Sequence, residues 1–279
     1  MENEIEQKDF NKHMIVTGPP VDLHEDQLIS GWLDARFHHA IGATVFLEQT
    51  RAINAKWHLL RLYDSKAPDA LLGVAVALTG GTCFWLPEDA SAAGALFPAI
   101  LDLRPCRIVT SSMGRDLLRS KVVPRAHFVR EYDQWVMVSA RRFPQASGRM
   151  AIASDIARLV EYQHQYNEER SVDDAPNWET LVAQEKVAVV DTDGQIVSVV
   201  RFGIETDRMV SIGGTYTFPA YRRRGFAERV LEFAVDRIVT AGRTAHLIVD
   251  IDNEPAVALY RRMGFECVGS SYVGYLEYQ

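Results

Sequence analysis

The sequence is short of cysteine and has no long uninterrupted apolar run, and each shortage excludes a class of protein. Its three cysteines are widely spaced and odd in number, which argues against a disulfide framework and favours a reducing, cytoplasmic environment. The longest apolar stretch, residues 70–86, is interrupted by Gly80-Gly81 and is too short to cross about 30 Å of hydrocarbon. We therefore expect no membrane association, and the acidic, polar first twelve residues predict no targeting segment.

Basic residues are also in deficit, because 30 Lys and Arg face 37 Asp and Glu, for a formal net charge of −7. A general binder of phosphate backbones needs a basic face, so we expect no nucleic-acid partner. The 47% of hydrophobic residues and the mean hydropathy of −0.10 are those of a folded globular chain. At roughly 100–200 residues per domain, the 279 residues allow one large domain or two smaller ones.

Metal-ligand spacings are missing as well. The eight histidines include one adjacent pair, His38-His39, whose side chains would point to different sides of a helix or strand. No His-x3-His or Cys-x2-Cys spacing occurs, and Ser111-Ser112 lacks the glycine context of a nucleophilic serine. We therefore expect neither a metal nor a covalent nucleophile. His164 is interpreted either as a structural histidine or as a substrate contact.

The chain divides near residues 140–148, where proline, serine and glycine lie beside charged residues, as in linkers. The predicted domains are 1–142 and 149–279. The patterning of the first domain predicts a mixed α/β structure, with helices near 27–37, 90–101 and 114–120 and strands at 58–63, 71–78, 82–86 and 107–110. This order leaves two interpretations open, a degenerate copy of the second domain or an unrelated α/β domain.

The second domain has a clearer pattern. Ser154-Asp155 predicts the start of a helix that runs to about Glu169, with residues 156, 159, 160 and 163 on its apolar face. Next come a helix at 178–183, strands at 187–191 and 196–202 joined by an Asp193-Gly194 turn, and a strand at 209–217. The last of these carries Gly213-Gly214 in its interior, which indicates a bulge or a close backbone approach.

A basic turn follows that strand and precedes a helix. The turn contains Arg222, Arg223, Arg224 and Gly225, and apolar residues then recur at helical spacing until Gly242. Unpaired backbone N–H groups and the positive end of the helix dipole make such a turn a candidate phosphate site. The alternative is an arginine run on a solvated face.

A second capped helix completes the domain. It follows a strand at 246–250, and Asp252 or Asn253 can cap it. One face of the helix carries Ala256, Leu259, Tyr260 and Met263, and Gly264 ends it. Two closing strands are predicted at 266–268 and 272–278.

Two motifs in this order resemble those of the Gcn5-related N-acetyltransferase (GNAT) superfamily, in its FR47-like branch. They are Arg222-x-x-Gly225-x-Ala227 and Asn253-x-x-Ala256-x-x-Leu259-Tyr260-x-x-x-Gly264-Phe265. The resemblance covers about Arg149–Gln279 and implies the GNAT fold, an α/β fold with a mixed sheet. It also implies a bound acyl-CoA, usually acetyl-CoA, and it makes a tandem arrangement with a degenerate GNAT-like first domain the preferred interpretation of residues 1–142.

The resemblance assigns cofactor contacts to the turn and its flanks: Tyr216, Thr217, Arg222, Arg223, Arg224, Gly225, Phe226, Ala227 and Asn253. Backbone N–H groups from 223 to 227 would hold the pyrophosphate. The backbone of Tyr216 and Thr217 would pair with the pantetheine arm where strands 209–217 and 246–250 splay apart. Asn253 would contact that arm or fix the start of its helix. Tyr260 would donate a proton to the departing CoA thiolate.

The general base is the point at which the sequence departs from the family. Acyl transfer needs the neutral amine, and deprotonating an alkylammonium at neutral pH costs roughly 4–5 kcal/mol. Several family members have a glutamate on the strand that corresponds to 209–217, but this strand carries no carboxylate. The alternatives are Glu205, Asp250, Glu179, or a water relay through Ser211 or Thr215.

The predicted function is therefore an N-acetyltransferase, acting on a primary amine of a small molecule or amino acid, in a monomer or homodimer. The alternative is a non-catalytic, CoA-binding or regulatory module whose base has been lost.

Overall fold

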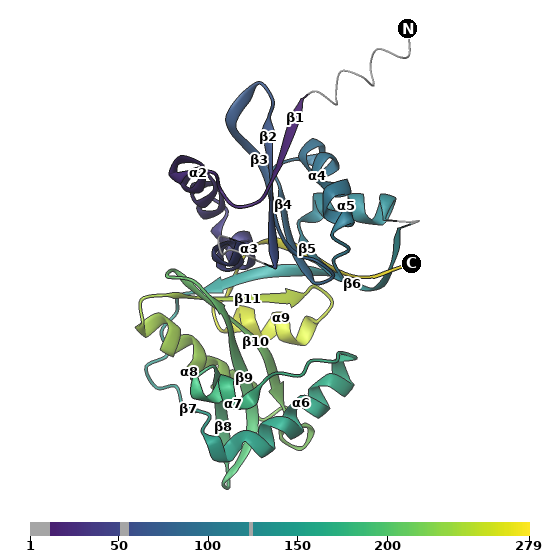
Figure 1. Cartoon of the computed structure of the whole chain (residues 1–279). Helices are drawn as coiled ribbons and strands as arrows, with labels where there is room; N and C mark the ends of the chain where they lie inside the picture. The colour runs from purple at the N-terminus through teal and green to yellow at the C-terminus, as the bar shows by residue number, and fades with distance from the viewer. Residues whose placement is uncertain (1–11, 51–55, 123–124) are drawn as a thin grey trace. The chain divides into compact units, whose positions relative to one another are not determined.

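The chain forms two compact units (Figure 1). Unit 1 comprises Met1–Val136, Asp250–Asp252 and Val268–Gln279, and unit 2 comprises Met137–Val249 and Asn253–Cys267. The computed structural model describes residues 12–50, 56–122 and 125–279. Among these, no helix is both long and apolar enough to cross a membrane.

Unit 1 is a sheet with strand order β1-β2-β3-β4-β5-β12-β6. Its elements are β1 (His13–Thr17), α2 (Leu23–Asp34), α3 (Phe37–Thr50), β2 (Trp57–Asp64), β3 (Ala67–Leu78), β4 (Thr82–Pro87), α4 (Ala90–Asp102), β5 (Arg107–Thr110), α5 (Ser112–Lys121), β6 (Ala126–Ser139) and the last strand of the chain, β12 (Glu266–Tyr278). Strands β1 to β4 are antiparallel neighbours, β4 and β5 are parallel, and β12 is antiparallel to β5.

Helices cover both faces of this sheet, because successive residues of a strand point to opposite sides. Leu60 and Leu62 of β2 belong to the core cluster formed with α4 and α5, whereas Leu59 and Tyr63 belong to the cluster formed with α2 and α3. Figure 1 shows these two helix pairs on opposite sides of the strands. The near-continuous apolar runs of β2 and β3 follow from burial on both faces.

Unit 2 repeats this construction, with strand order β11-β10-β9-β8-β7. Its elements are β7 (Arg149–Met150), the 3-10 helix η1 (Ala153–Asp155), α6 (Ile156–Arg170), α7 (Trp178–Ala183), β8 (Val187–Thr192), β9 (Gln195–Glu205), β10 (Met209–Thr217), the 3-10 helix η2 (Pro219–Tyr221), α8 (Phe226–Thr240), β11 (Thr244–Asp250) and α9 (Glu254–Arg262). Neighbouring strands are antiparallel except β10 and β11, which are parallel. Asp193 and Gly194 both have positive φ, 51° and 74°, which confirms the predicted hairpin turn.

The core of unit 2 lies between its sheet and helices. Leu159 and Tyr162 of α6 pack with Trp178 of α7 against alternate valines of β8 and β9. Helix α8 contacts β8, β9 and β10 through a buried apolar stripe. One predicted core residue was wrong: Val160 is 43% exposed, because the buried face of α6 passes through 159, 162 and 163 instead.

The same order of elements thus occurs twice along the chain. Unit 1 has β2-β3-β4-α4-β5-α5, and unit 2 has β8-β9-β10-α8-β11-α9, each with one parallel pair after the antiparallel strands. This repeat confirms the predicted tandem arrangement and excludes the interpretation of the first half as an unrelated fold.

The end of the chain differs from the prediction of two closing strands, because residues 266–278 form the single strand β12. Its later residues pair with β5 in unit 1, with Tyr272 opposite Thr110. Gly269 lies inside the strand beside His39, and a Cβ at Gly269 would lie 2.4 Å from the imidazole Cε1. The glycine therefore permits close packing with His39.

Candidate functional site

The turn between β10 and α8 leaves the N-terminus of α8 uncapped. Gly225 occupies the N-cap position with a φ of 80°, and within the described part of the chain no side-chain hydrogen bond caps the helix. Arg223 also lies in the left-handed region, with a φ of 60°. The backbone N–H groups of the first helical turn have no partner inside the helix, and the helix dipole adds partial positive charge. The turn is therefore built to accept an anion.

This turn borders open space, because a Cβ added at Gly225 would meet nothing within 4 Å. An acyl-CoA pyrophosphate fits these residues on two counts, the uncapped N–H groups and the room beside the glycine. A longer, acidic side chain at position 225 would fill that room and place a negative charge in it.

Strands β10 and β11 provide the second part of the site. They pair in parallel from Met209 and Thr244 to Ser211 and His246, and among the described residues they do not pair beyond that point. Strand β10 nevertheless continues to Thr217, with a bulge between Gly213 and Tyr216 in its pairing with β9. The edge of β10 that faces away from β9 is thus available to hydrogen-bond a further extended segment.

The predicted contact residue Arg222 is held by the protein itself. Its Nη2 atom lies 2.7 Å from both carboxylate oxygens of Glu169 on α6, and its Nε donates to the carbonyl oxygen of Thr217 at 2.9 Å. The Tyr216 hydroxyl donates to the same Glu169 carboxylate at 2.8 Å. Burial, together with this carboxylate, raises the pKa of Tyr216 to about 12. Arg222 therefore ties the turn to α6.

Tyr260 reaches the bulge of β10 from α9. Its hydroxyl forms a hydrogen bond with Thr215, and its ring packs against Phe265 with centroids 5.6 Å apart. Burial raises the pKa of Tyr260, although the bond with Thr215 opposes the shift, so the phenol keeps its proton at neutral pH. Asn253 caps α9, with its Oδ1 accepting from the Ala256 N–H at 3.4 Å. Of the two roles considered for Asn253, the structure shows the fixing of the helix start.

Sequence comparison identifies this part of the chain. The profile of the acetyltransferase (GNAT) family matches residues 154–265, which include the turn, both splayed strands and α9. Residues 154–265 form a GNAT acetyltransferase domain. No curated protein matches the chain significantly, and the FR47-like subtype stays a prediction.

Solved structures extend the likeness of fold to both units. A GCN5-related N-acetyltransferase from Sphaerobacter thermophilus is 16% identical over 95% of each chain, with a TM-score of 0.58. A GNAT-family acetyltransferase from Colwellia psychrerythraea is 14% identical over 95% of this chain and 100% of its own, with a TM-score of 0.53. A Drosophila protein is 12% identical over 94% of this chain and 99% of its own, with a TM-score of 0.61. The tandem fold is therefore shared, although these identities show the fold alone.

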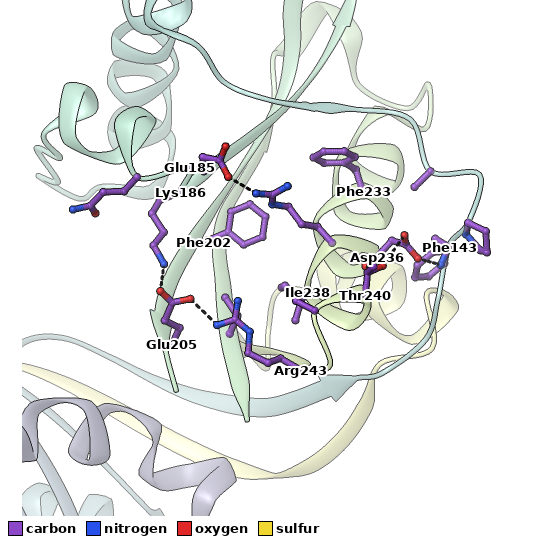
Figure 2. Close-up of a pocket in the computed structure, with 16 residues that line it drawn as sticks. Phe143, Glu185, Lys186, Phe202, Glu205, Phe233, Asp236, Ile238, Thr240 and Arg243 are labelled. Carbon is purple, nitrogen blue, oxygen red and sulfur yellow. Dashed lines mark hydrogen bonds and ion pairs between the residues drawn. The ribbon is translucent and has the colours of Figure 1, made fainter. Parts of the chain in front are cut away.

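Glu205, one candidate base of the GNAT domain, lies in a different place. It lines a groove of about 1010 Å³ formed by residues 184–186 before β8, by β9, by the C-terminal half of α8 and by the segment 143–146, and it lies there between Lys186 and Arg243 (Figure 2). The hydrogen bond from Lys186, followed by that from Arg243, lowers the pKa of Glu205, which makes it a weak base. Arg243 lies just past the C-terminus of α8, and a 15-residue helix separates its ends by about 22 Å. Glu205 is therefore remote from the turn at Gly225.

The other two candidate carboxylates are not brought to Tyr260 by any contact among the described residues. Asp250 belongs to unit 1, where Gln134 donates to its Oδ1 at 2.8 Å. Glu179 lies exposed in the first turn of α7. Among the contacts of the described residues, no carboxylate bonds to Thr215 or Tyr260. Of the proposed alternatives, the relay through Thr215 is the one beside Tyr260.

His164, one of the residues considered for substrate contact, is exposed. Within residues 12–50, 56–122 and 125–279, no group of three or more His, Cys, Asp or Glu side chains could hold a metal ion.

The corresponding turn of unit 1 is closed. Asp89 caps α4, with its Oδ1 accepting from the Ala92 N–H at 2.8 Å, and Glu88 precedes it. Two carboxylates thus stand where the GNAT domain has arginines and glycine, and one already satisfies the helix N-terminus. A phosphate would meet charge repulsion there.

Sequence reasoning missed Glu169 and the residues above the β10 bulge. A Cβ at Gly214 would lie 2.6 Å from Arg201 Nε and 2.7 Å from the Tyr162 hydroxyl oxygen, which donates to the Gly214 carbonyl at 2.8 Å. Tyr162 of α6 and Arg201 of β9 therefore both lie against Gly214 of β10.

Proposed function

We propose that the GNAT domain transfers an acetyl group from acetyl-CoA to a primary amine of a small molecule or amino acid. The observation that carries this proposal is the uncapped N-terminus of α8 at Gly225, continuous with the edge of β10 that stops pairing after Ser211. A ligand with a pyrophosphate at one end and an amide-bearing arm matches this pair of features. Acetyl-CoA is such a ligand and supplies the acetyl thioester.

Binding is divided between the turn and the strand. Backbone N–H groups from Arg223 to Ala227 hold the pyrophosphate, while the ion pair of Arg222 with Glu169 fixes the shape of the turn. The backbone of Tyr216 and Thr217 pairs with the pantetheine arm. Neither contact requires a metal.

The chemistry needs one proton donor and one proton acceptor. As the amine nitrogen bonds to the acetyl carbon, the carbon–sulfur bond breaks and the thiolate takes the proton of the Tyr260 hydroxyl. The nitrogen, positively charged once its new bond has formed, gives up its second proton, which restores the Tyr260 phenol and leaves a neutral amide. The ammonium proton must leave first, at a cost of roughly 4–5 kcal/mol at neutral pH. With no carboxylate on β10, that proton leaves through water held by Thr215 or Ser211.

The absence of a carboxylate from the sequence of β10 also favours a second candidate function, a CoA-binding module without turnover. Acetylation of any amine by the purified protein distinguishes the two functions, because only the enzyme consumes acetyl-CoA.

The test is a thermal-shift titration with acetyl-CoA and with free CoA, on the wild type and on Gly225→Glu. The substitution places a carboxylate in the phosphate position and forces a non-glycine residue to a φ of 80°. Gly242→Glu is the matched control, because Gly242 has a φ of 77°, has nothing within 4 Å of an added Cβ, and lies past the other end of α8. Both variants carry a similar backbone strain of roughly 1–2 kcal/mol.

At 100 times the Kd, a ligand adds about 2.7 kcal/mol, enough to raise the Tm by several degrees. We expect that rise in the wild type and in Gly242→Glu, but not in Gly225→Glu. No rise in the wild type at millimolar acetyl-CoA would contradict both candidate functions. A rise that Gly225→Glu keeps would contradict the assignment of the turn.

A further inference from the structure

Arg201 of β9 presents an unused hydrogen-bonding edge beside the bulge of β10. We infer that it binds a carboxylate of the acceptor, so that the substrate is an amine with a neighbouring carboxylate, as in an amino acid. This inference rests on the proposed function and narrows its acceptor to one chemical class.

One of the three guanidinium nitrogens of Arg201 has a hydrogen-bond partner in the protein. Its Nη1 donates to Asp174 Oδ2 at 2.8 Å, and the side chain is only 20% exposed. Among the hydrogen bonds of the described residues, none involves its Nε or Nη2. These two atoms form the edge that binds a carboxylate through two parallel hydrogen bonds. A cationic edge that is mostly buried and has no acceptor is costly, and a ligand carboxylate would satisfy it.

The edge faces the bulge because Gly214 has no side chain to cover it. An ideal Cβ at Gly214 would lie 2.6 Å from Nε and 3.1 Å from Nη2 of Arg201, so any larger residue would displace the guanidinium. Gly214 also has a φ of 60°, which suits glycine. Gly214 therefore lets the positive charge of Arg201 lie beside β10, the strand that carries no carboxylate.

This edge is next to the proton donor. Thr215, which bonds to the Tyr260 hydroxyl, directly follows Gly214, and consecutive Cα atoms are about 3.8 Å apart. Tyr166 neighbours both groups, since its ring lies 5.9 Å from the Arg201 guanidinium carbon and it interacts with Tyr260. An acceptor held by Arg201 thus has its amine and its carboxylate close together. A simple alkylamine would leave the guanidinium edge unpaired.

The test compares kcat/KM for amino acids with that for their carboxamides, which keep the amine and the shape and lose the negative charge. The panel is the twenty common amino acids with acetyl-CoA. We expect the acids that are acetylated to exceed their amides by roughly 10–100-fold. Arg201→Gln should abolish this ratio, and Arg201→Lys, which keeps the charge without the paired edge, should reduce it. The KM for acetyl-CoA should stay unchanged.

Asp174→Asn is the matched control, because it breaks the same ion pair and leaves the Nε–Nη2 edge intact. It should keep the preference for acids. Equal kcat/KM for acids and amides in the wild type would overturn the inference and leave the proposed acetyltransferase function standing. Loss of the ratio in Asp174→Asn as well as in Arg201→Gln would assign Arg201 a purely structural role and also overturn it. Tight acetyl-CoA binding without acetylation of any panel member would instead contradict the proposed function.

Discussion

Arg222 and Glu169 join the turn at Gly225 to the end of α6, with Nη2 of Arg222 at 2.7 Å from each carboxylate oxygen. Both side chains are about 40% exposed, and an exposed ion pair adds only about 0–1 kcal/mol to stability. Its effect is therefore one of position. It holds the turn, whose Arg223 is in the left-handed region, in the shape that presents the N–H groups.

Glu169→Gln should weaken acetyl-CoA binding by about 3–10-fold, which corresponds to roughly 1 kcal/mol, the scale of one exposed ion pair. The free energy of unfolding should change by less than about 1 kcal/mol. Isothermal titration calorimetry measures the first quantity and urea denaturation the second. Glu168→Gln removes the same charge from the adjacent exposed position and should leave the Kd unchanged. Equal affinities in the two variants would refute the role of the ion pair.

The tandem repeat predicts an asymmetric stoichiometry. In unit 1 the helix that follows the corresponding turn is capped by Asp89, so of these two turns we expect the one at Gly225 to take a pyrophosphate. Calorimetric titration should give one acetyl-CoA per chain, and Gly225→Glu should abolish the whole signal rather than half. A stoichiometry of two, or a residual site in Gly225→Glu, would show that unit 1 binds the ligand despite its acidic turn.

Local chemistry could be predicted from the sequence. The strands Arg107–Thr110 and Met209–Thr217 and the helix Trp178–Ala183 have the predicted bounds, because each is delimited by neighbouring residues in the chain. The same is true of the Asp193-Gly194 turn, whose two positive φ values are a property of those two residues. The turn at residues 222–225 is another such feature, because the glycine that precedes the apolar helix pattern determines the backbone conformation of the turn.

Long-range placement could not be predicted in the same way. Glu169 precedes Arg222 by 53 residues, and no local pattern marks it as a partner. The strand that ends the chain pairs with β5, and the His39 ring packs against Gly269 where a side chain would otherwise lie. No pattern in the sequence indicates this contact. Helix α3 was missed for a related reason, because its mixed run Phe37–Thr50 becomes a helix through the core it shares with β2 and β4. These features depend on contacts that only the folded chain contains.

Tyr260→Phe tests the proton donor. It should lower kcat by about 10–100-fold, near the lower end of what a positioned acid contributes. The Kd for acetyl-CoA should not change, because the phenol acts on the departing sulfur. The raised pKa of Tyr260 further predicts that its ionisation reduces kcat only above pH 10. Tyr275→Phe, a tyrosine of unit 1, is the control. A variant with wild-type turnover would remove Tyr260 from the chemistry.

Asp155 links the stability of unit 2 to pH. Burial by itself would raise the pKa of Asp155, but the hydrogen bonds from Arg149 (Nη1–Oδ2 2.5 Å) and from the Ile152 N–H outweigh it, and the pKa is lowered. These contacts also explain why Asp155 does not cap α6 as its position suggested. A folded-state pKa below the unfolded value of about 3.9 means that the contribution is complete at neutral pH and is lost on acidification.

The free energy of unfolding from urea titrations at pH 7 and near pH 3 measures this contribution. We expect Asp155→Asn to lose about 1–3 kcal/mol at pH 7, and to lose less further stability than the wild type when the pH falls. Asp193→Asn is the control, because Asp193 is exposed in the β8–β9 turn at a φ of 51° that asparagine also adopts. It should keep the wild-type pH dependence. If all three proteins lost the same free energy between the two pH values, the Arg149–Asp155 contact would contribute nothing to acid sensitivity.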